Sequence, residues 1–274
     1  MNAWTHVFIT IACCLILFPQ AQAQQSWQFR WEPGQVLKYR VHHKTLVVEK
    51  LGESSVKASA NLQLIKQWKI VAVDKQGVAT VQFSLEWMRN EQQFPDGKTW
   101  LFDSKQLDKS TPSLKGMSKM IGIPLAVLRV APSGEVIKAD KGSLKRYQSE
   151  PPFQIVFSQK SVKLGESWER EYKLQTNPRG ESASYPAVQT YTYKNSKKGL
   201  ATFRLKTVFN KVPDNPFDQI PLLQKQPQGT VTFNTKAGRL EQVTLNISKE
   251  LENHQGKNTR YMFQSEYTER YVGD

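Results

Sequence analysis

The fold is decided by an alternating stretch in the first half of the chain, Gly77-Val78-Ala79-Thr80-Val81-Gln82-Phe83-Ser84-Leu85-Glu86-Trp87. Apolar side chains occupy the odd positions from Ala79 to Trp87, and polar side chains fill most of the even ones. Successive side chains of a β-strand point to opposite faces, so this period of two predicts a strand with one buried face.

The same alternation continues through much of the chain with less regularity. It occurs in Leu37–Val48, Leu62–Val73, Val188–Tyr193, Leu200–Phe209, Gly229–Asn234, Leu240–Ser248 and a closing strand over Tyr261–Tyr271. Turn-prone residues separate such runs at Asp74–Gly77, Pro132–Gly134 and Lys236–Gly238. Short turns between alternating runs are typical of antiparallel hairpins, so we predict a mainly β fold with minor α content.

An internal repeat organises these strands. Gly77–Phe83 recurs as Gly199–Leu205, Pro33–Leu37 recurs as Leu164–Trp168, and Ser133–Val136 recurs as Ala237–Leu240. Three pairs in one order predict two similar antiparallel curved-sheet modules. We place them at residues 24–150 and 151–274, with a boundary near Pro151-Pro152.

Helical signals are confined to two short segments. Thr111-Pro112-Ser113 is expected to cap a helix that carries Leu114, Met117, Met120 and Ile121 at helical spacing. Lys141–Gln148 is expected to add one or two turns. Four prolines between Asn210 and Pro227 oppose a central strand or a regular helix there. We expect an extended loop with an apolar tip, packed at a sheet edge in preference to the alternative of a lid over the sheet.

The first residues are typical of a secretory signal peptide. An apolar run from Val7 to Phe18 is followed by Ala21-Gln22-Ala23, which has small residues at the positions that a signal peptidase requires. We therefore predict a signal peptide over residues 1–23 with cleavage after Ala23, and export to the periplasm or beyond. A retained membrane anchor is the alternative.

Charge and cysteine content narrow the class of partner. Both cysteines, Cys13 and Cys14, lie in the predicted signal peptide, so the mature chain would have no disulfide and no cysteine nucleophile or zinc ligand. Lys and Arg exceed Asp and Glu by 38 to 24, a net charge of +14. Such a balance favours an anionic lipid or envelope polymer as partner, and export argues against nucleic acid. The alternative is that the lysines only occupy the solvent-exposed face of the sheet and bind no specific partner.

No catalytic, metal or cofactor site is predicted. Adjacent His42 and His43 would point to opposite faces of a strand and so would not chelate one metal, and His254 is the third histidine of the predicted mature chain. The acidic pairs Glu166 with Glu169 and Glu250 with Glu252 have basic neighbours, as on a solvated face. Because no nucleophile elbow, phosphate loop or dinucleotide motif occurs, we expect a protein that is not an enzyme and needs no cofactor.

Aromatic residues are predicted to fill the core. Trp27, Phe29 and Trp31 alternate as on one face of an amino-terminal strand, with a carbohydrate or lipid platform as the alternative. Four further tryptophans are also predicted to be buried: Trp68, Trp87, Trp100 and Trp168.

Three short motifs carry a resemblance to a known family. They are Phe102-Asp103-Ser104, Gly134-Glu135-Val136 and Val162-Lys163-Leu164-Gly165-Glu166-Ser167-Trp168. In this order the chain resembles an uncharacterised family of exported, β-rich bacterial proteins, several of which are lipoproteins. It departs from those lipoproteins in having no lipobox cysteine at the predicted mature start. The resemblance implies no activity and no functional residues.

These observations favour an exported, envelope-associated binding or structural protein whose concave sheet holds an apolar or anionic lipidic ligand. Two alternatives stay open. One is an envelope polysaccharide hydrolase, which would bring two carboxylates together in an aromatic-lined cleft. The other is a purely structural module that interacts with other envelope proteins.

Overall fold

The computed structural model describes residues 26–176 and 183–273, and in this part of the chain twelve strands form a single antiparallel sheet. The predicted mainly β fold with a curved antiparallel sheet is confirmed. The strands are β1 (Val36–Leu51), β2 (Ser54–Val73), β3 (Ala79–Gln93), β4 (Thr99–Asp103), β5 (Ala126–Val130), β6 (Val136–Lys141), β7 (Ser167–Thr176), β8 (Ala183–Lys197), β9 (Leu200–Phe209), β10 (Gln228–Asn234), β11 (Arg239–Glu252) and β12 (Thr259–Gly273).

Strand order joins the two halves of the chain. The sheet runs β6-β5-β3-β2-β1-β12-β11-β10-β9-β8-β7, and β4 extends it beside β3. Most strands therefore lie beside a neighbour in sequence, although β5 pairs with β3 and not with β4, and β6 and β7 lie at opposite ends of the sheet. The first strand pairs with the last at the centre. Both predicted modules contribute to this one sheet, and their division near Pro151-Pro152 stays a prediction.

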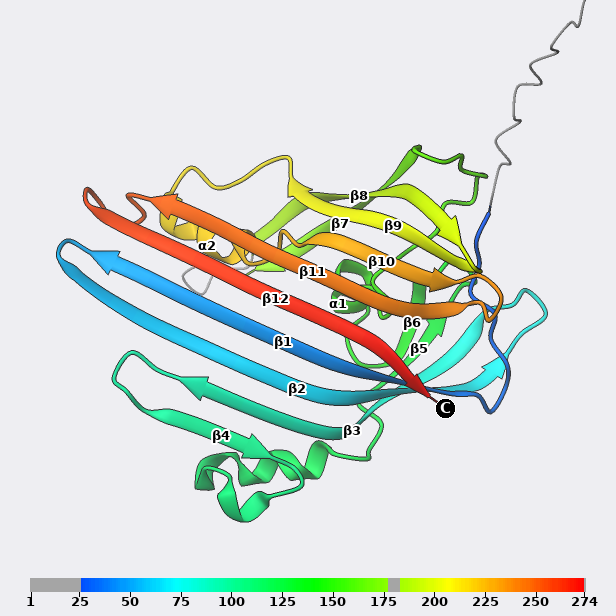
Figure 1. The fold of residues 1–274 in the computed structure, drawn as a ribbon, viewed down its shortest axis with the longest axis horizontal. Helices are drawn as coiled ribbons and strands as arrows, with labels where there is room; N and C mark the ends of the chain where they lie inside the picture. The colour runs from blue at the N-terminus through cyan, green and yellow to red at the C-terminus, as the bar shows by residue number, and fades with distance from the viewer. Residues whose placement is uncertain (1–25, 177–182, 274) are drawn as a thin grey trace, which may run out of the picture.

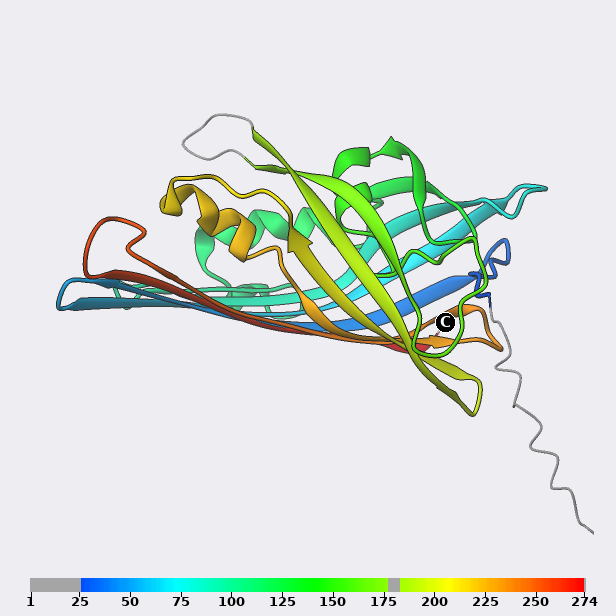
Figure 2. The same cartoon turned by 90° about the horizontal axis from the view of Figure 1, so that it is seen from above.

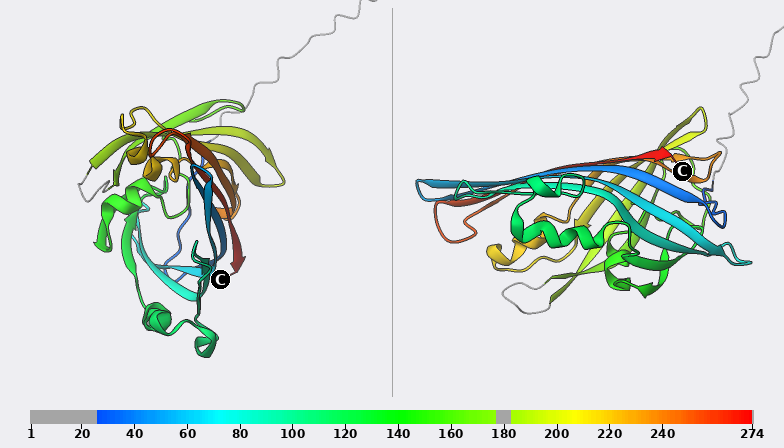
Figure 3. Two further views of the ribbon diagram at one scale, coloured as in Figure 1. Left: turned by 90° about the vertical axis from the view of Figure 1, so that its left-hand side faces the viewer. Right: turned by 90° about the horizontal axis from the view of Figure 1, so that it is seen from below.

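The sheet is a long curved trough with two different ends (Figure 1). We call the end where β1 begins and β12 finishes the closed end, and the opposite end the open end. In Figures 2 and 3, the short helices lie on the concave side, and the outer strands of the two halves curve toward each other across it. Helix α1 (Leu144–Ser149) contacts both β6 and β7, the strands that finish the sheet on either side.

Aromatic side chains fill the closed end. Trp27, Phe29 and Trp31 are buried there, as predicted, but their backbone is an irregular segment and not a strand. The rings of Phe29 and Trp31 stack at a centroid distance of 4.8 Å, and Phe153 lies 5.0 Å from Phe29. The amino-terminal segment therefore packs between the curved flanks of the sheet together with Phe153 and Phe157. These rings are buried by packing alone, without their backbone joining the sheet.

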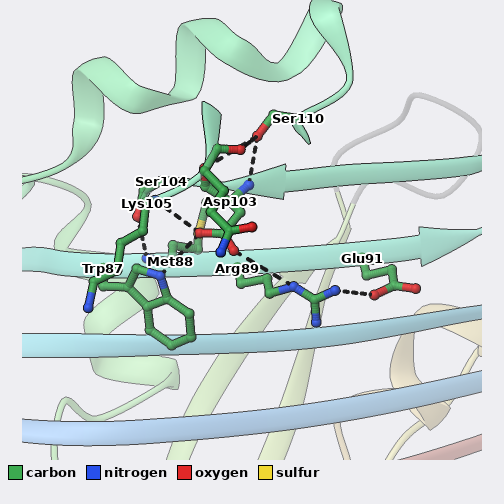
Figure 4. Close-up of polar contacts among 9 residues, drawn as sticks. Trp87, Met88, Arg89, Glu91, Asp103, Ser104, Lys105 and Ser110 are labelled. Carbon is green, nitrogen blue, oxygen red and sulfur yellow. Dashed lines mark hydrogen bonds and ion pairs between the residues drawn. The ribbon is translucent and has the colours of Figure 1, made fainter. Parts of the chain in front are cut away.

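A β-bulge corrects the prediction for Trp87. In the pairing of β2 with β3, Ile65 lies opposite Trp87 while Lys66 lies opposite Leu85, so Glu86 is an extra residue. An extra residue shifts the alternation by one and turns the following side chains to the other face. Trp87 is therefore half-buried on the outer face, where its Nε1 donates to Asp103 at 3.3 Å (Figure 4).

Trp100 is also not a core residue. Its side chain is 41% exposed on the short strand β4, where it packs on Phe94 with ring centroids 4.7 Å apart. Trp68 is buried and Trp168 packs partly buried against the core, as predicted. The strand β4 lies at the margin of the sheet beside the 3₁₀ helices η1 (Leu107–Lys109) and η2 (Pro112–Met120), the second of which matches the predicted helical segment.

The proline-rich segment contradicts two expectations. It contains a regular helix, α2 (Pro216–Leu223), which begins with Pro216 at a position whose backbone N–H needs no helical partner. Pro221 lies inside this short helix. The helix packs over the concave face against Ile247 and Phe263 and not at a sheet edge, because its apolar side chains bury more surface there.

Candidate functional site

A hollow of about 380 Å³ lies on the concave face, between the closed-end core and the open end. Its floor is formed by the central strands β1, β11 and β12, and β7 and β8 form one wall. The carboxyl-terminal ends of α1 and α2 and the residues that follow them cover it. The hollow therefore lies where the curved sheet changes from a filled interior to an uncovered face.

Apolar side chains form much of the floor and wall. They come from alternate positions of their strands, because only every second residue faces the concave side. The apolar and aromatic lining residues are Tyr172, Leu174, Leu245, Ile247, Phe263 and Tyr267. Half-buried Val47 lies further along β1 toward the open end, and half-buried Leu62 lies on β2 directly opposite His43. Apolar side chains therefore adjoin the hollow both along β1 and across it on β2.

Polar side chains lie on the floor and the wall of the hollow as well as on its cover. The Nε2 of His43 lies 2.8 Å from the hydroxyl oxygen of the buried Ser265. Burial, the Lys225 ammonium and neighbouring His42 lower the pKa of His43 below its ordinary value, which favours the neutral imidazole. On the wall, the Gln189 side-chain amide donates to Thr207 Oγ1 at 3.2 Å. The hollow thus combines an apolar floor with a few buried hydrogen-bonding groups, as ligand sites commonly do.

A buried ion pair separates the hollow from the closed-end core. Lys66 Nζ lies 2.6 Å from Glu269 Oε1, and their side chains are 10% and 0% exposed. The Tyr267 hydroxyl, at the margin of the hollow, donates to the other Glu269 oxygen. Burial, followed by the Glu269 charge, raises the pKa of Tyr267 well above its ordinary value. This network places a buried, charged group directly behind Tyr267, on the side of the hollow that faces the closed-end core.

The cover of the hollow is held by one exposed ion pair. Lys225, just beyond α2, lies 2.5 Å from Glu150, which follows α1. Gln224 also donates to the Tyr261 hydroxyl on β12 at 2.7 Å. The two short helices are far apart in sequence, and these contacts connect them across the concave face.

The predicted histidines lie as expected on opposite faces of β1. His42 faces outward, with its Nε2 2.8 Å from Asn61 Oδ1, whereas His43 faces the hollow. His254 is buried in the β11–β12 turn, 2.7 Å from Glu49 Oε1. Within residues 26–176 and 183–273, no group of three His, Cys, Asp or Glu side chains gathers in a way that would hold a metal ion.

The predicted acidic pairs make local contacts. Glu250 and Glu252 both lie beside Arg260 on neighbouring β12, and the Arg260 Nε is 3.4 Å from Glu252. Glu166 accepts a hydrogen bond from the backbone N–H of Lys163 at 2.8 Å. Neither pair faces the hollow.

A second, more polar cavity of about 690 Å³ lies beside the edge strand β7. Three carboxylates line it: Glu135 before β6, and Glu169 and Glu171 on β7. Trp168 contributes an aromatic wall. Several cations share the cavity, namely Lys145, Lys160, Arg170 and Lys173.

Sequence reasoning did not identify the hollow. Two of its polar contributors, His43 and Ser265, are 222 positions apart and become neighbours only because β1 pairs with β12. Alternation along each strand did mark the inward positions, but it does not show which inward positions remain uncovered. Among the residues that the structure describes, no helix has the length and apolar character needed to cross a membrane.

Fold and site together define a mainly β protein with one curved antiparallel sheet and a hollow on its concave face. No protein-family profile matches the chain, and no curated protein matches it either. Among solved structures, the chain is similar in fold to lipovitellin, from a study of lipid–protein interactions, with a TM-score of 0.52 and 11% identity. The similarity covers 88% of this chain and 25% of lipovitellin, so the chain spans about a quarter of that protein.

Two other structures are matched over most of their length but at low scores. DynF, from the dynemicin biosynthesis pathway of Micromonospora chersina, has 7% identity and a TM-score of 0.22, with 93% of this chain and 88% of DynF covered. A DUF1329 family protein from Desulfovibrio piger has 10% identity and a TM-score of 0.17, with 88% of each chain covered. Scores this low carry no argument about fold or function, and the resemblance to an uncharacterised exported family stays a prediction.

Proposed function

We propose that this chain is an exported, envelope-associated protein that binds an apolar or lipidic ligand in the concave hollow and does not transform it. The observation that carries the proposal is the apolar floor of the hollow beside a buried polar group, His43 with Ser265. Its volume of about 380 Å³ falls within the range of small-molecule sites. The fold similarity to lipovitellin, described in terms of lipid–protein interactions, supports the same class of ligand.

The physical basis is the removal of apolar surface from water. Burying apolar surface contributes roughly 25 cal/mol per Å². Ile247 and Phe263 are largely buried beside α2, so an apolar chain in the hollow would cover what remains exposed of its lining and the half-buried Val47. The hydrogen-bonding groups of the hollow would then orient a polar head.

The test is uptake of a fluorescent apolar probe, N-phenyl-naphthylamine, by the purified chain. We expect saturable binding to the wild type and at least a tenfold loss of affinity in Ile247→Trp, because the larger ring fills the hollow. Ser248→Trp is the matched control, since Ser248 is exposed on the outer face of the same strand. Circular dichroism should show both variants folded. No probe uptake by the wild type, or equal uptake by Ile247→Trp, would overturn the proposal.

A polysaccharide hydrolase is the second candidate, and the observation that favours it is the cavity beside β7. This cavity combines Glu135, Glu169 and Glu171 with the indole of Trp168. A two-carboxylate mechanism needs two carboxyl groups about 5 to 10 Å apart, on either side of the bond that is cleaved. Release of reducing sugar from envelope polysaccharide, abolished by Glu135→Gln or Glu169→Gln, would establish this candidate in place of binding alone.

A further inference from the structure

The outer face of the sheet carries two arginines directly opposite each other. Arg40 on β1 pairs in register with Arg270 on β12, and both are exposed. Side chains at directly opposite positions have Cβ atoms about 5 Å apart, and like charges there are destabilising. No ion pair found among the described residues includes either arginine.

The nearby acids already have partners. Glu86 lies 3.0 Å from Lys38, and Glu91 lies 2.8 Å from Arg89. Asp103 accepts from the Trp87 indole and from a backbone N–H, and lies 3.9 Å from the Arg89 Nε (Figure 4). The positive charge of the arginine pair is therefore not balanced by these neighbours.

The same region has an aromatic wall and a third cation. Arg40 is opposite Ile65, and Ile65 is opposite Trp87, so the three side chains form one row on the outer face. Lys105 Nζ lies 5.7 Å from the centre of the Trp87 ring. A depression of about 440 Å³ is lined by Arg40, Val41, His42, Gln63, Ile65, Trp87 and Lys105, and Arg270 lies next to it, opposite Arg40.

We propose that this depression is a binding site for a phosphate group on a phosphate-ester ligand. Within it, the Arg40 guanidinium presents a fork of N–H donors that matches phosphate oxygens, and Lys105 adds a second positive charge. Arg270 extends the positive surface beside Arg40 from the neighbouring strand β12. The Trp87 and Ile65 side chains provide a flat apolar wall for the organic part of the ester. The site lies on the outer face, opposite the hollow, and does not depend on the function proposed for the hollow.

The bulge at Glu86 is what makes this arrangement possible. Without the extra residue, regular alternation would place Trp87 on the concave face with Phe83 and Leu85. The outer row would then have no aromatic wall beside Arg40. A sheet distortion that exposes part of an indole next to two unpaired arginines is consistent with a binding role for this region.

The test compares two charge-matched double variants. Arg40→Gln/Arg270→Gln removes the proposed site, and Arg204→Gln/Lys206→Gln removes two exposed cations from the outer face of β9. The probes are glycerol 1-phosphate, followed by calorimetry, and vesicles of phosphatidylglycerol and phosphatidylcholine, followed by sedimentation at low salt. We expect at least a tenfold loss of binding in the first variant and less than a twofold loss in the control.

The two probes distinguish the source of the phosphate. Binding of glycerol phosphate without binding of vesicles identifies a soluble phosphate ester, and vesicle binding that glycerol phosphate competes away identifies a lipid headgroup. Both results support the site. Because Arg40→Gln/Arg270→Gln also removes a repulsion, its melting temperature should not fall, and its uptake of the apolar probe should be unchanged. Equal binding by this variant and the wild type, or an equal loss in the control, would overturn the proposal.

Discussion

The closed and open ends of the sheet share the same long strands but differ in what covers their concave face. At the closed end, two irregular segments place Phe29 and Phe153 between the curved flanks, and both rings are fully or nearly fully buried. Toward the open end, Val47 faces the same side of β1 as the fully buried Leu37 and Tyr39 but remains half-buried. Apolar alternation therefore continues along the whole strand, while only one end encloses a core. The closed end therefore contributes most to the stability of the fold, whereas the apolar surface available to a ligand lies away from it.

The largest effect should come from removing an aromatic ring at the closed end. Phe153→Ala deletes a fully buried ring and should lower the free energy of unfolding by about 3–5 kcal/mol. Val47→Ala, toward the open end, shortens a half-buried side chain and should cost less than about 1.5 kcal/mol. Urea unfolding of both variants measures the contrast. Equal costs would show that the open end is as well packed as the closed end.

The ion pair between the two regions gives the next prediction. Glu269→Leu leaves the Lys66 ammonium buried without its partner and should cost about 3 kcal/mol. The double variant Lys66→Met/Glu269→Leu should recover much of that loss, because no unpaired charge then remains buried. A double-mutant cycle by chemical denaturation checks this. A double variant as unstable as the sum of the two single variants would show that the pair is not coupled.

Acid should lower the stability of the protein through His43, which lines the hollow. Burial lowers the pKa of His43, so between that pKa and the ordinary value of about 6.5 the unfolded chain binds more protons than the folded one. The stability that the neutral imidazole contributes is complete above about pH 6.5 and is lost as the pH falls below it.

The measurement is the urea midpoint at several pH values between 5 and 8. His43→Gln should flatten the loss of stability below pH 6.5. His42→Gln is the comparison variant, because the outward-facing His42 makes the smallest of the contributions that lower the pKa of His43. The pH dependence of its stability should stay close to that of the wild type. An unchanged slope in His43→Gln would assign the acid sensitivity to other groups.

The smallest expected effect on stability concerns the cover of the hollow. Lys225→Gln removes an exposed ion pair with Glu150 and should change the free energy of unfolding by less than about 1 kcal/mol. It should nevertheless speed release of the apolar probe, because the pair connects the residues beyond α1 and α2 across the hollow. Stopped-flow release compares it with Lys211→Gln, an exposed lysine outside that contact. Equal release rates would show that the ion pair does not restrain the cover.

Much of the fold was predictable because strand alternation is a local property. The strand over Leu200–Phe209 was predicted with its observed bounds, and most other long strands were predicted within their observed limits. The prediction for Trp87 was wrong because a single bulged residue depends on the partner strand. The prediction of an edge-packed, helix-free proline segment was also wrong, since α2 is stabilised by the sheet face beneath it.

The sequence by itself determined which residues form antiparallel strands and which side of most strands is apolar, because side-chain direction alternates with every residue. It also determined the excess of positive charge. Only the tertiary structure decided which apolar positions are enclosed and which line the hollow, because that depends on β1 pairing with β12 and on two segments that fill just one end. The pairing of His43 with Ser265 and of Arg40 with Arg270 has the same origin, since strand register brings together residues that no local pattern relates.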